Sequence, residues 1–233
     1  MRMYYMTCAR WGEVILNEQR LKLSRFYESN DPFELKLVDN RQPEARRMVR
    51  MISEYFNRTI GMICFGASWA SPVMWAHYAA KHTGLCLGFD IEDKLLSQVK
   101  YTDAKITVPF GEHLPRHGLS EELLLKILLT KATDWSYERE YRALSDLKTK
   151  DPKAGLHYLD FGPQVQLREV IIGHRCSWTI AKTRKLIRDV AASVRICKAR
   201  PGFGKFEMVE RKDVRAATIK PPRKPEKGTV GLR

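Results

Sequence analysis

Between residues 45 and 89, the spacing of apolar residues changes from helical to alternating. Within Ala45–Phe56 the apolar positions recur at i, i+3, i+4 and i+7, which predicts a helix with one buried stripe. Arg46, Arg47 and Arg50 fall outside that stripe, so the predicted helix has a basic face. The next predicted elements are a buried strand over Ile60–Phe65, a helix over Val73–His82 that starts after Ser71-Pro72 and stops before Gly84, and a strand over Leu85–Phe89.

The second half of the chain has mainly strand patterns. Ser120 precedes two acidic residues and a run that is apolar nearly all round, which predicts a central helix. Pro109–Gly118 is expected to be a loop. The other predicted elements are strands over Glu138–Leu144, Leu156–Phe161, Val165–Ile172, Val194–Ala199 and Phe203–Glu210, and a helix over Ser177–Ala192. These elements predict an α+β fold with a mixed, mainly antiparallel sheet, continuous or split, and helices inserted in the N-terminal half.

Composition and charge are typical of one folded domain with a basic tail. The 233 residues include 41 Lys or Arg and 27 Asp or Glu, a formal net charge of +14, and 44% are hydrophobic. We expect a single domain over residues 1–213. Residues 214–233 contain six Lys or Arg, one Glu and three Pro, so a basic, flexible tail is expected there. The charge excludes an acidic solvating protein and suits phosphate groups as partners.

Several common classes of protein are disfavoured by missing patterns. No apolar run is long enough for a membrane span, and the first residues do not resemble a signal peptide, so a cytoplasmic protein without membrane insertion is expected. Five cysteines without a C-x-x-C pair fit reduced thiols rather than a zinc site. Gly202-Phe203-Gly204 lacks a third glycine and no P-loop occurs, which disfavours Rossmann and P-loop enzymes. His113 and His117 have metal-ligand spacing, but Pro115 separates them, so no metal site is predicted.

The first candidate cluster is the polar and aromatic segment Ser24–Glu34. An Asn30-Asp31-Pro32 turn ends a strand-like approach, and such a turn can place hydroxyl and amide groups at a cleft. The alternative is a structural turn in which Asn30 and Asp31 bond their own backbone.

The second cluster is the aromatic segment Met74–Cys86. Trp75, His77, Tyr78 and His82 could stack on a base or a nicotinamide ring and supply hydrogen bonds. Equally, the tryptophan and tyrosine could belong to the core, with His82 interacting with the helix dipole.

The third cluster, Trp135–Arg142, is the richest in charge. On a strand, Glu138, Glu140 and Arg142 project from one face. They form either a neutralised surface ladder or a catalytic edge. In the second case a carboxylate could stabilise positive charge developing on a sugar, or help to hold a metal ion.

Taken together and in this order, the three clusters resemble the bacterial domain-of-unknown-function 2971 family. The segments that carry the resemblance are Asn30–Glu34, Met74–Tyr78 with His82–Asp90, and Trp135–Arg142. This family implies no established activity.

A more distant similarity is to ADP-ribosyltransferase toxin-like domains, which are split-sheet α+β folds that bind NAD without a Rossmann motif. In that comparison Tyr5, Ser24 and Glu140 take the places of the early aromatic, the strand serine and the late catalytic glutamate. The resemblance implies NAD as co-substrate, a nucleic acid or protein acceptor, and a toxin or phage-defence setting. Glu140 would stabilise the oxocarbenium ion that forms as nicotinamide leaves, with Glu138 and Arg142 assisting.

Two other classes of function fit the same residues. A metal-dependent nuclease could hold Mg²⁺ with Asp31, Glu34, Glu138 and Glu140, because this ion prefers oxygen ligands. A non-catalytic module could instead bind nucleic acid through the basic helix face and the basic tail.

Overall fold

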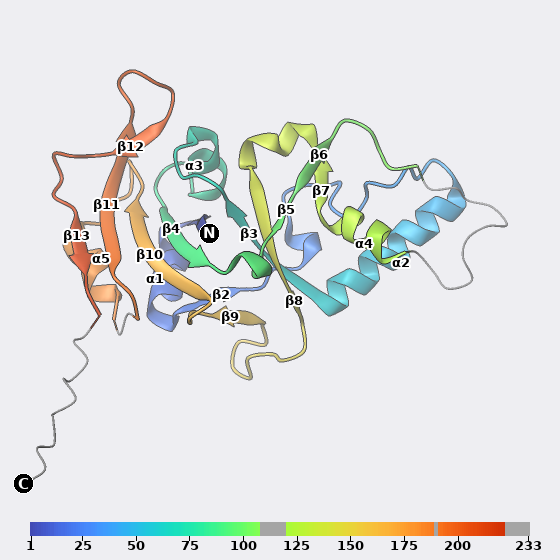
Figure 1. Ribbon diagram of the computed structural model, residues 1–233, viewed down its shortest axis with the longest axis horizontal. Helices are drawn as coiled ribbons and strands as arrows, with labels where there is room; N and C mark the ends of the chain where they lie inside the picture. Colours follow the sequence, from blue (N-terminus) through green and yellow to red (C-terminus); the bar gives the residue numbers. More distant parts are fainter. Residues whose placement is uncertain (108–119, 189–190, 222–233) are drawn as a thin grey trace, which may run out of the picture.

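The computed structural model describes residues 1–107, 120–188 and 191–221. A nine-stranded sheet forms its centre, with the order β12-β11-β10-β4-β1-β3-β8-β5, and β13 also pairs with β11 (Figure 1). Every pair in it is antiparallel except β10 with β11. The strands are β1 (Arg2–Thr7), β3 (Ile60–Gly66), β4 (Leu85–Ile91), β5 (Ser97–Gln98), β8 (Glu140–Asp146), β10 (Val165–Ile172), β11 (Val194–Pro201), β12 (Met208–Glu210) and β13 (Ala217–Ile219).

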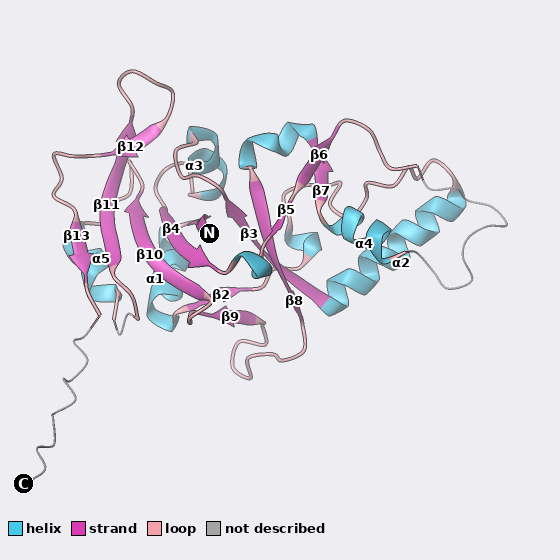
Figure 2. Ribbon diagram, viewed as in Figure 1, coloured by secondary structure: helices cyan, strands magenta, loops and turns pink. Residues whose placement is uncertain are grey.

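In the described residues, the remaining elements are two small strand pairs, five helices and three short 3-10 turns (Figure 2). β2 (Arg20–Lys22) pairs antiparallel with β9 (Tyr158–Asp160), and β6 (Lys100–Thr102) pairs parallel with β7 (Thr130–Ala132). The helices and turns are α1 (Ala9–Glu18), α2 (Pro43–Thr59), α3 (Pro72–Tyr78), α4 (Glu121–Leu128), α5 (Ile180–Leu186), η1 (Phe26–Glu28), η2 (Asp93–Leu95) and η3 (Thr133–Glu138). This arrangement confirms the predicted mixed α+β fold with a mainly antiparallel sheet. No helix in the described ranges is long and apolar enough to cross a membrane.

Side-chain alternation along the strands divides the core between the two faces of the sheet. One face packs against α1 and carries residues such as Leu85, Leu87 and Phe89. The opposite face has two separate clusters. One is built around Trp75 of α3, and the other joins α2 to α4 beyond β8 (Figure 1). Between the two clusters, no helix of the described residues packs its apolar side chains over the middle of this face, where β1, β3 and β8 lie.

The sheet separates between β1 and β3. These strands share a single registered pair, Tyr4 with Gly66, whereas β1 pairs with β4 at six positions. Farther along β3, Ser24 takes over as the antiparallel partner, because its N–H and carbonyl exchange hydrogen bonds of 2.8 Å with Met62. Backbone and side-chain groups between these two points therefore border an opening in the sheet.

Several predicted elements are confirmed, with changed ends. α2, β3, β4, β8 and β10 all occur, and Ser71 and Ser120 cap α3 and α4 as expected. The prediction that the helix after Ser120 is central is wrong: Leu125 is 45% exposed and only the last turn of α4 is buried. The helix expected over Ser177–Ala192 is shorter, because Thr179 caps it and α5 ends at Leu186. The strand expected from Phe203 begins at Met208.

Two predicted segments lie partly or wholly outside the described residues. β13 lies within the segment 214–233 that was expected to be a flexible tail, so paired structure extends past residue 213. The expected loop Pro109–Gly118, with His113 and His117, lies outside the described residues, as does the end of the tail from residue 222.

Candidate active site

A cavity of about 240 Å³ occupies the opening between β1 and β3. Its side walls come from the two facing strands, and the segment that carries Ser24, Glu28 and Asn30 forms another wall. Tyr78, Lys131, Glu138 and Glu140 supply the remaining polar lining. The cavity thus lies where the two clusters on this face of the sheet leave a gap.

Local backbone geometry explains why Glu138 and Glu140, which are two residues apart, lie on the same wall of the cavity. Glu138 ends the 3-10 turn η3, and Arg139 follows in the left-handed conformation with φ of 45°. Glu140 then begins β8, so Glu138 is not on the strand as the sequence predicted. The turn at Arg139 nevertheless brings the two glutamates to the same wall. The backbone of Glu140 is held by its N–H, which donates to the Tyr101 hydroxyl at 2.9 Å.

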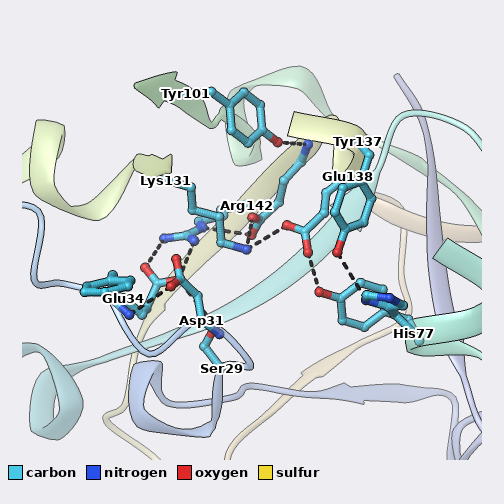
Figure 3. Close-up of polar contacts among 12 residues, drawn as sticks. Ser29, Asp31, Glu34, His77, Tyr101, Lys131, Tyr137, Glu138 and Arg142 are labelled. Atoms are coloured by element: carbon cyan, nitrogen blue, oxygen red, sulfur yellow. Dashed lines mark hydrogen bonds and ion pairs between the residues drawn. The ribbon is translucent and has the colours of Figure 1, made fainter. Parts of the chain in front are cut away.

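Lys131 joins the two carboxylates. Its Nζ lies 2.7 Å from Glu138 Oε2, to which it donates a hydrogen bond, and 2.7 Å from Glu140 Oε2 (Figure 3). The second contact is an ion pair without hydrogen-bond geometry, so Glu140 Oε2 accepts no hydrogen bond from the described residues. All three side chains are nearly buried. Glu140 Oε2 is therefore a buried oxygen whose charged neighbour is the Lys131 ammonium.

Arg142 lies behind this wall. It is fully buried, its Nε donates to Glu140 Oε1 at 2.8 Å, and its two terminal nitrogens donate to both oxygens of Glu34 at 2.8 Å (Figure 3). One of them also donates to the carbonyl of Leu128 at 2.6 Å. Such bidentate pairing fixes the guanidinium rigidly. Arg142 therefore holds Glu140 in position without lining the cavity.

The surroundings shift the pKa values of Glu138 and Glu140 in opposite directions. Although burial opposes it, the cations of Arg142 and Lys131 hold the pKa of Glu140 at about 2. Burial raises the pKa of Glu138 above its ordinary value, with Lys131 opposing. At neutral pH Glu140 is thus a fixed anion, whereas Glu138 is the more basic of the two. Paired groups with separated pKa values are a recurrent sign of acid–base chemistry.

Tyr78 completes the polar lining on the side of α3. Its hydroxyl donates a short hydrogen bond to Glu138. Burial and this carboxylate raise the pKa of Tyr78 well above its usual value, so the phenol stays protonated. Tyr78 therefore acts as a hydrogen-bond donor that orients Glu138.

Of the residues selected from the sequence, six line the cavity: Tyr5, Ser24, Asn30, Tyr78, Glu138 and Glu140. They come from β1, the segment before η1, the segment after it, α3, η3 and β8. The ring of Tyr5 packs against Phe65 at 6.1 Å between centroids, and burial raises the pKa of this tyrosine to about 12. The structure thus brings together the three residues, Tyr5, Ser24 and Glu140, that the sequence placed at corresponding positions of a split-sheet fold.

The other selected residues lie elsewhere. Trp75 is fully buried and its Nε1 donates to Trp69 O at 2.6 Å, so neither ring face is open to a ligand. α3 ends at Tyr78 rather than at residue 82, so His82 lies beyond the helix. Its ring stacks against that of Trp75, with 6.5 Å between the ring centroids. His77 contacts the Tyr137 hydroxyl through Nδ1 at 3.1 Å, outside the cavity (Figure 3). Asp31 accepts from Phe33 N–H at 2.8 Å, which is the alternative expected for a structural turn.

Sequence reasoning missed Lys131 and the role of Glu34. Lys131 follows Lys126 at the end of a mostly apolar run, a position at which burial requires a charged partner. The pairing of Glu34 with Arg142 spans 108 residues and had no local signal. Within the described ranges, no three or more His, Cys, Asp or Glu side chains form a group that could hold a metal ion. Glu34, Glu138 and Glu140 are instead paired with cations.

Comparisons with known proteins add a family resemblance without an activity. No curated protein and no solved structure matches the chain. One family model, described as protein of unknown function (DUF2971), matches residues 74–143. This stretch includes α3, β4 and the four residues Lys131, Glu138, Glu140 and Arg142 of the charge network. The match supports the resemblance of this chain to the DUF2971 family, whose function is unknown.

Proposed function

We propose that this protein is an NAD-consuming enzyme that cleaves the bond between nicotinamide and ribose and transfers ADP-ribose to an acceptor. The observation that carries the proposal is the pair of neighbouring carboxylates, Glu138 and Glu140, with separated pKa values on one wall of a cavity in the opened sheet. Splitting an N-glycosidic bond requires a fixed negative charge near the sugar and a base for the attacking group.

Glu140 supplies the fixed negative charge. Breaking the C–N bond leaves positive charge on the ribose, and the bonding electrons return to the pyridinium ring, so nicotinamide departs as a neutral molecule. Glu140 lines the cavity and its Oε2 is ion-paired with Lys131, so a ribose hydroxyl that donates to this carboxylate must share or displace that contact. An ionised carboxylate held in a low-dielectric site stabilises such charge strongly.

Glu138 acts as the general base. The acceptor attacks the anomeric carbon through an oxygen or nitrogen, and the proton of that atom passes to Glu138. The raised pKa of this carboxylate makes it the better base of the two. Tyr78 and Lys131 hold its two oxygens and thereby set its orientation.

The size of the cavity limits which part of NAD it could enclose. At about 240 Å³ it is smaller than the ~300–1,000 Å³ typical of sites for whole ligands. The cavity therefore suits the nicotinamide and its ribose, while the adenylate half would lie outside. Ser24 and Asn30 provide hydroxyl and amide groups at the wall for the nicotinamide carboxamide or a ribose hydroxyl.

The test is release of nicotinamide from NAD by the purified protein, followed by chromatography with and without mixed nucleic acid and protein acceptors. We expect release by the wild type and a loss of at least ~100-fold in Glu140→Gln, the range typical of losing an electrostatic stabiliser. The matched control is Glu44→Gln, because Glu44 is exposed on the first turn of α2. Circular dichroism verifies folding, and Ser24→Ala is a milder second change in the cavity. Release that is undiminished in folded Glu140→Gln contradicts the assignment.

A further inference from the structure

A second hollow, open to solvent and about 500 Å³ in volume, lies between η1 and α2. Three arginines line it: Arg25 before η1, and Arg50 and Arg58 on α2. The lining also contains Tyr27, Asn57 and one acidic residue, Glu54. We call this surface the arginine groove.

The positive charge of the arginine groove is not neutralised within the protein. None of the three arginines forms an ion pair with another residue in the described ranges, although many of the other arginines do. Arg50 and Arg58 are exposed. An unpaired cluster of guanidinium groups attracts phosphate, which it binds with well-directed hydrogen bonds.

Tyr27 gives the arginine groove an aromatic surface. Its side chain is 67% exposed, although large aromatic side chains are usually buried. The backbone N–H of Tyr27 donates to Asn57 Oδ1 at 3.0 Å, which fastens the residue to α2. An exposed ring beside arginines is the arrangement that stacks on an unpaired base while the cations contact the phosphates on either side.

The arginine groove and the cavity share one wall. Within the segment 24–30, Arg25 and Tyr27 line the groove, whereas Ser24, Glu28 and Asn30 line the cavity. A strand held in the groove would therefore lie against the same segment that borders the cavity. Only this segment would separate the strand from a sugar bound in the cavity.

We propose that the arginine groove binds single-stranded nucleic acid and that this strand is the acceptor of ADP-ribose. The second half of this inference rests on the proposed function. A single strand fits better than a duplex, because the bases of a duplex are already stacked and cannot reach Tyr27.

The test is binding of fluorescein-labelled 12-nucleotide single strands, DNA and RNA, measured by anisotropy without NAD. The same binding is measured for the double variant with Arg50→Glu and Arg58→Glu. We expect affinity to fall at least tenfold and the salt dependence of binding to weaken by roughly 1.4 in slope, since about 0.7 is lost for each phosphate contact. The control double change is Arg184→Glu with Lys185→Glu on α5, which are exposed and distant from the groove.

A third variant, Tyr27→Ala, separates stacking from charge. It should weaken binding of single strands and leave the weaker binding of a duplex of the same sequence unchanged. Equal affinity for single strand and duplex in the wild type, or equal losses in the two double variants, overturns the inference. Nicotinamide release by wild-type protein without any oligonucleotide tests the proposed function separately, so the two failures can be told apart. Comparison of the DNA and RNA oligonucleotides identifies which nucleic acid the arginine groove prefers.

Discussion

At the scale of single residues, Lys131 and Arg142 determine the electrostatics of the cavity, and of these two only Arg142 was predicted to assist Glu140. They form ion pairs with Glu138, Glu140 and Glu34 in a nearly buried network. Tyr5, Ser24 and Glu140, which were selected from the sequence, line one cavity, and their role in catalysis stays a prediction. Arg142 and Glu140 are only two residues apart, but the other ion pairs could not be predicted, since their partners are 7 to 108 residues apart and the contacts depend on the packing of the whole face.

Replacing Arg142 by Met should destabilise the protein severely. The change leaves Glu34 buried without its cation and Glu140 with Lys131 alone, and breaking comparable buried pairs costs about 3–5 kcal/mol. Urea unfolding measures the difference, with Arg47→Met on the exposed face of α2 as the control. A loss of stability no larger than that of the control would show that the network is not structural.

The carboxylate of Glu140 should also make stability depend on pH. Its pKa is depressed to about 2 in the folded chain, so its contribution is complete above the unfolded value near 4.3 and is lost as pH falls toward 2. A shift of this size corresponds to about 3 kcal/mol. Glu138, whose pKa is raised, acts in the opposite sense.

The measurement is urea unfolding of wild type and Glu140→Gln at several pH values from 6 to 2. The stability difference between them should shrink as the wild-type carboxylate becomes protonated in that window. A difference that stays constant down to pH 2 would mean that Glu140 is not held as an anion by its neighbours.

At the scale of elements, the starts of α3 and α4 were easier to predict than the end of α3. Ser71-Pro72 and Ser120 predict where α3 and α4 begin, because capping is a local interaction. The end of α3 was placed four residues too late, since Ala80, Lys81 and His82 all adopt positive φ, which their side chains disfavour. That tight connection is imposed by the contact between β4 and β1, a tertiary constraint with no signature in residue spacing.

Gly84 is the point at which this constraint can be tested. A Cβ at position 84 would lie 2.1 Å from the carbonyl oxygen of Thr7 and 2.9 Å from that of Ala79, and both are backbone atoms. Gly84→Ala should therefore cost about 3 kcal/mol, the upper part of the range for overpacking. Gly162→Ala is the control, because nothing lies within 4 Å of its added Cβ. Thermal unfolding of both variants checks this, and equal melting temperatures would contradict the tight connection.

At the scale of the whole molecule, the sequence predicted the fold class and left open whether the sheet is split. Periodicity identifies strands but not their neighbours, so the order β4-β1-β3-β8 and the opening between β1 and β3 came only from the structure. The helices leave this opening uncovered because their apolar stripes pack on either side of it. The cavity is consequently a property of the topology rather than of any one element.

If NAD binds across this opening, it should stabilise the folded chain as a whole. At a ligand concentration 100 times the dissociation constant, the gain is about 2.7 kcal/mol, and each kcal/mol raises the melting temperature by roughly 2–4 °C at this chain length. Differential scanning fluorimetry measures the shift. Cys64→Phe supplies the control, since Cys64 lines the cavity and a larger ring there would occupy it. An equal shift in this variant would place NAD elsewhere.

The most direct test of the account is a comparison of NAD binding and nicotinamide release in wild type and Glu140→Gln under single-turnover conditions. The account predicts a dissociation constant that is nearly unchanged and a release rate at least ~100-fold lower, because Glu140 acts on the charge that develops as the bond breaks. Release at the wild-type rate by the folded variant, or no binding of NAD to the wild-type protein, would contradict it.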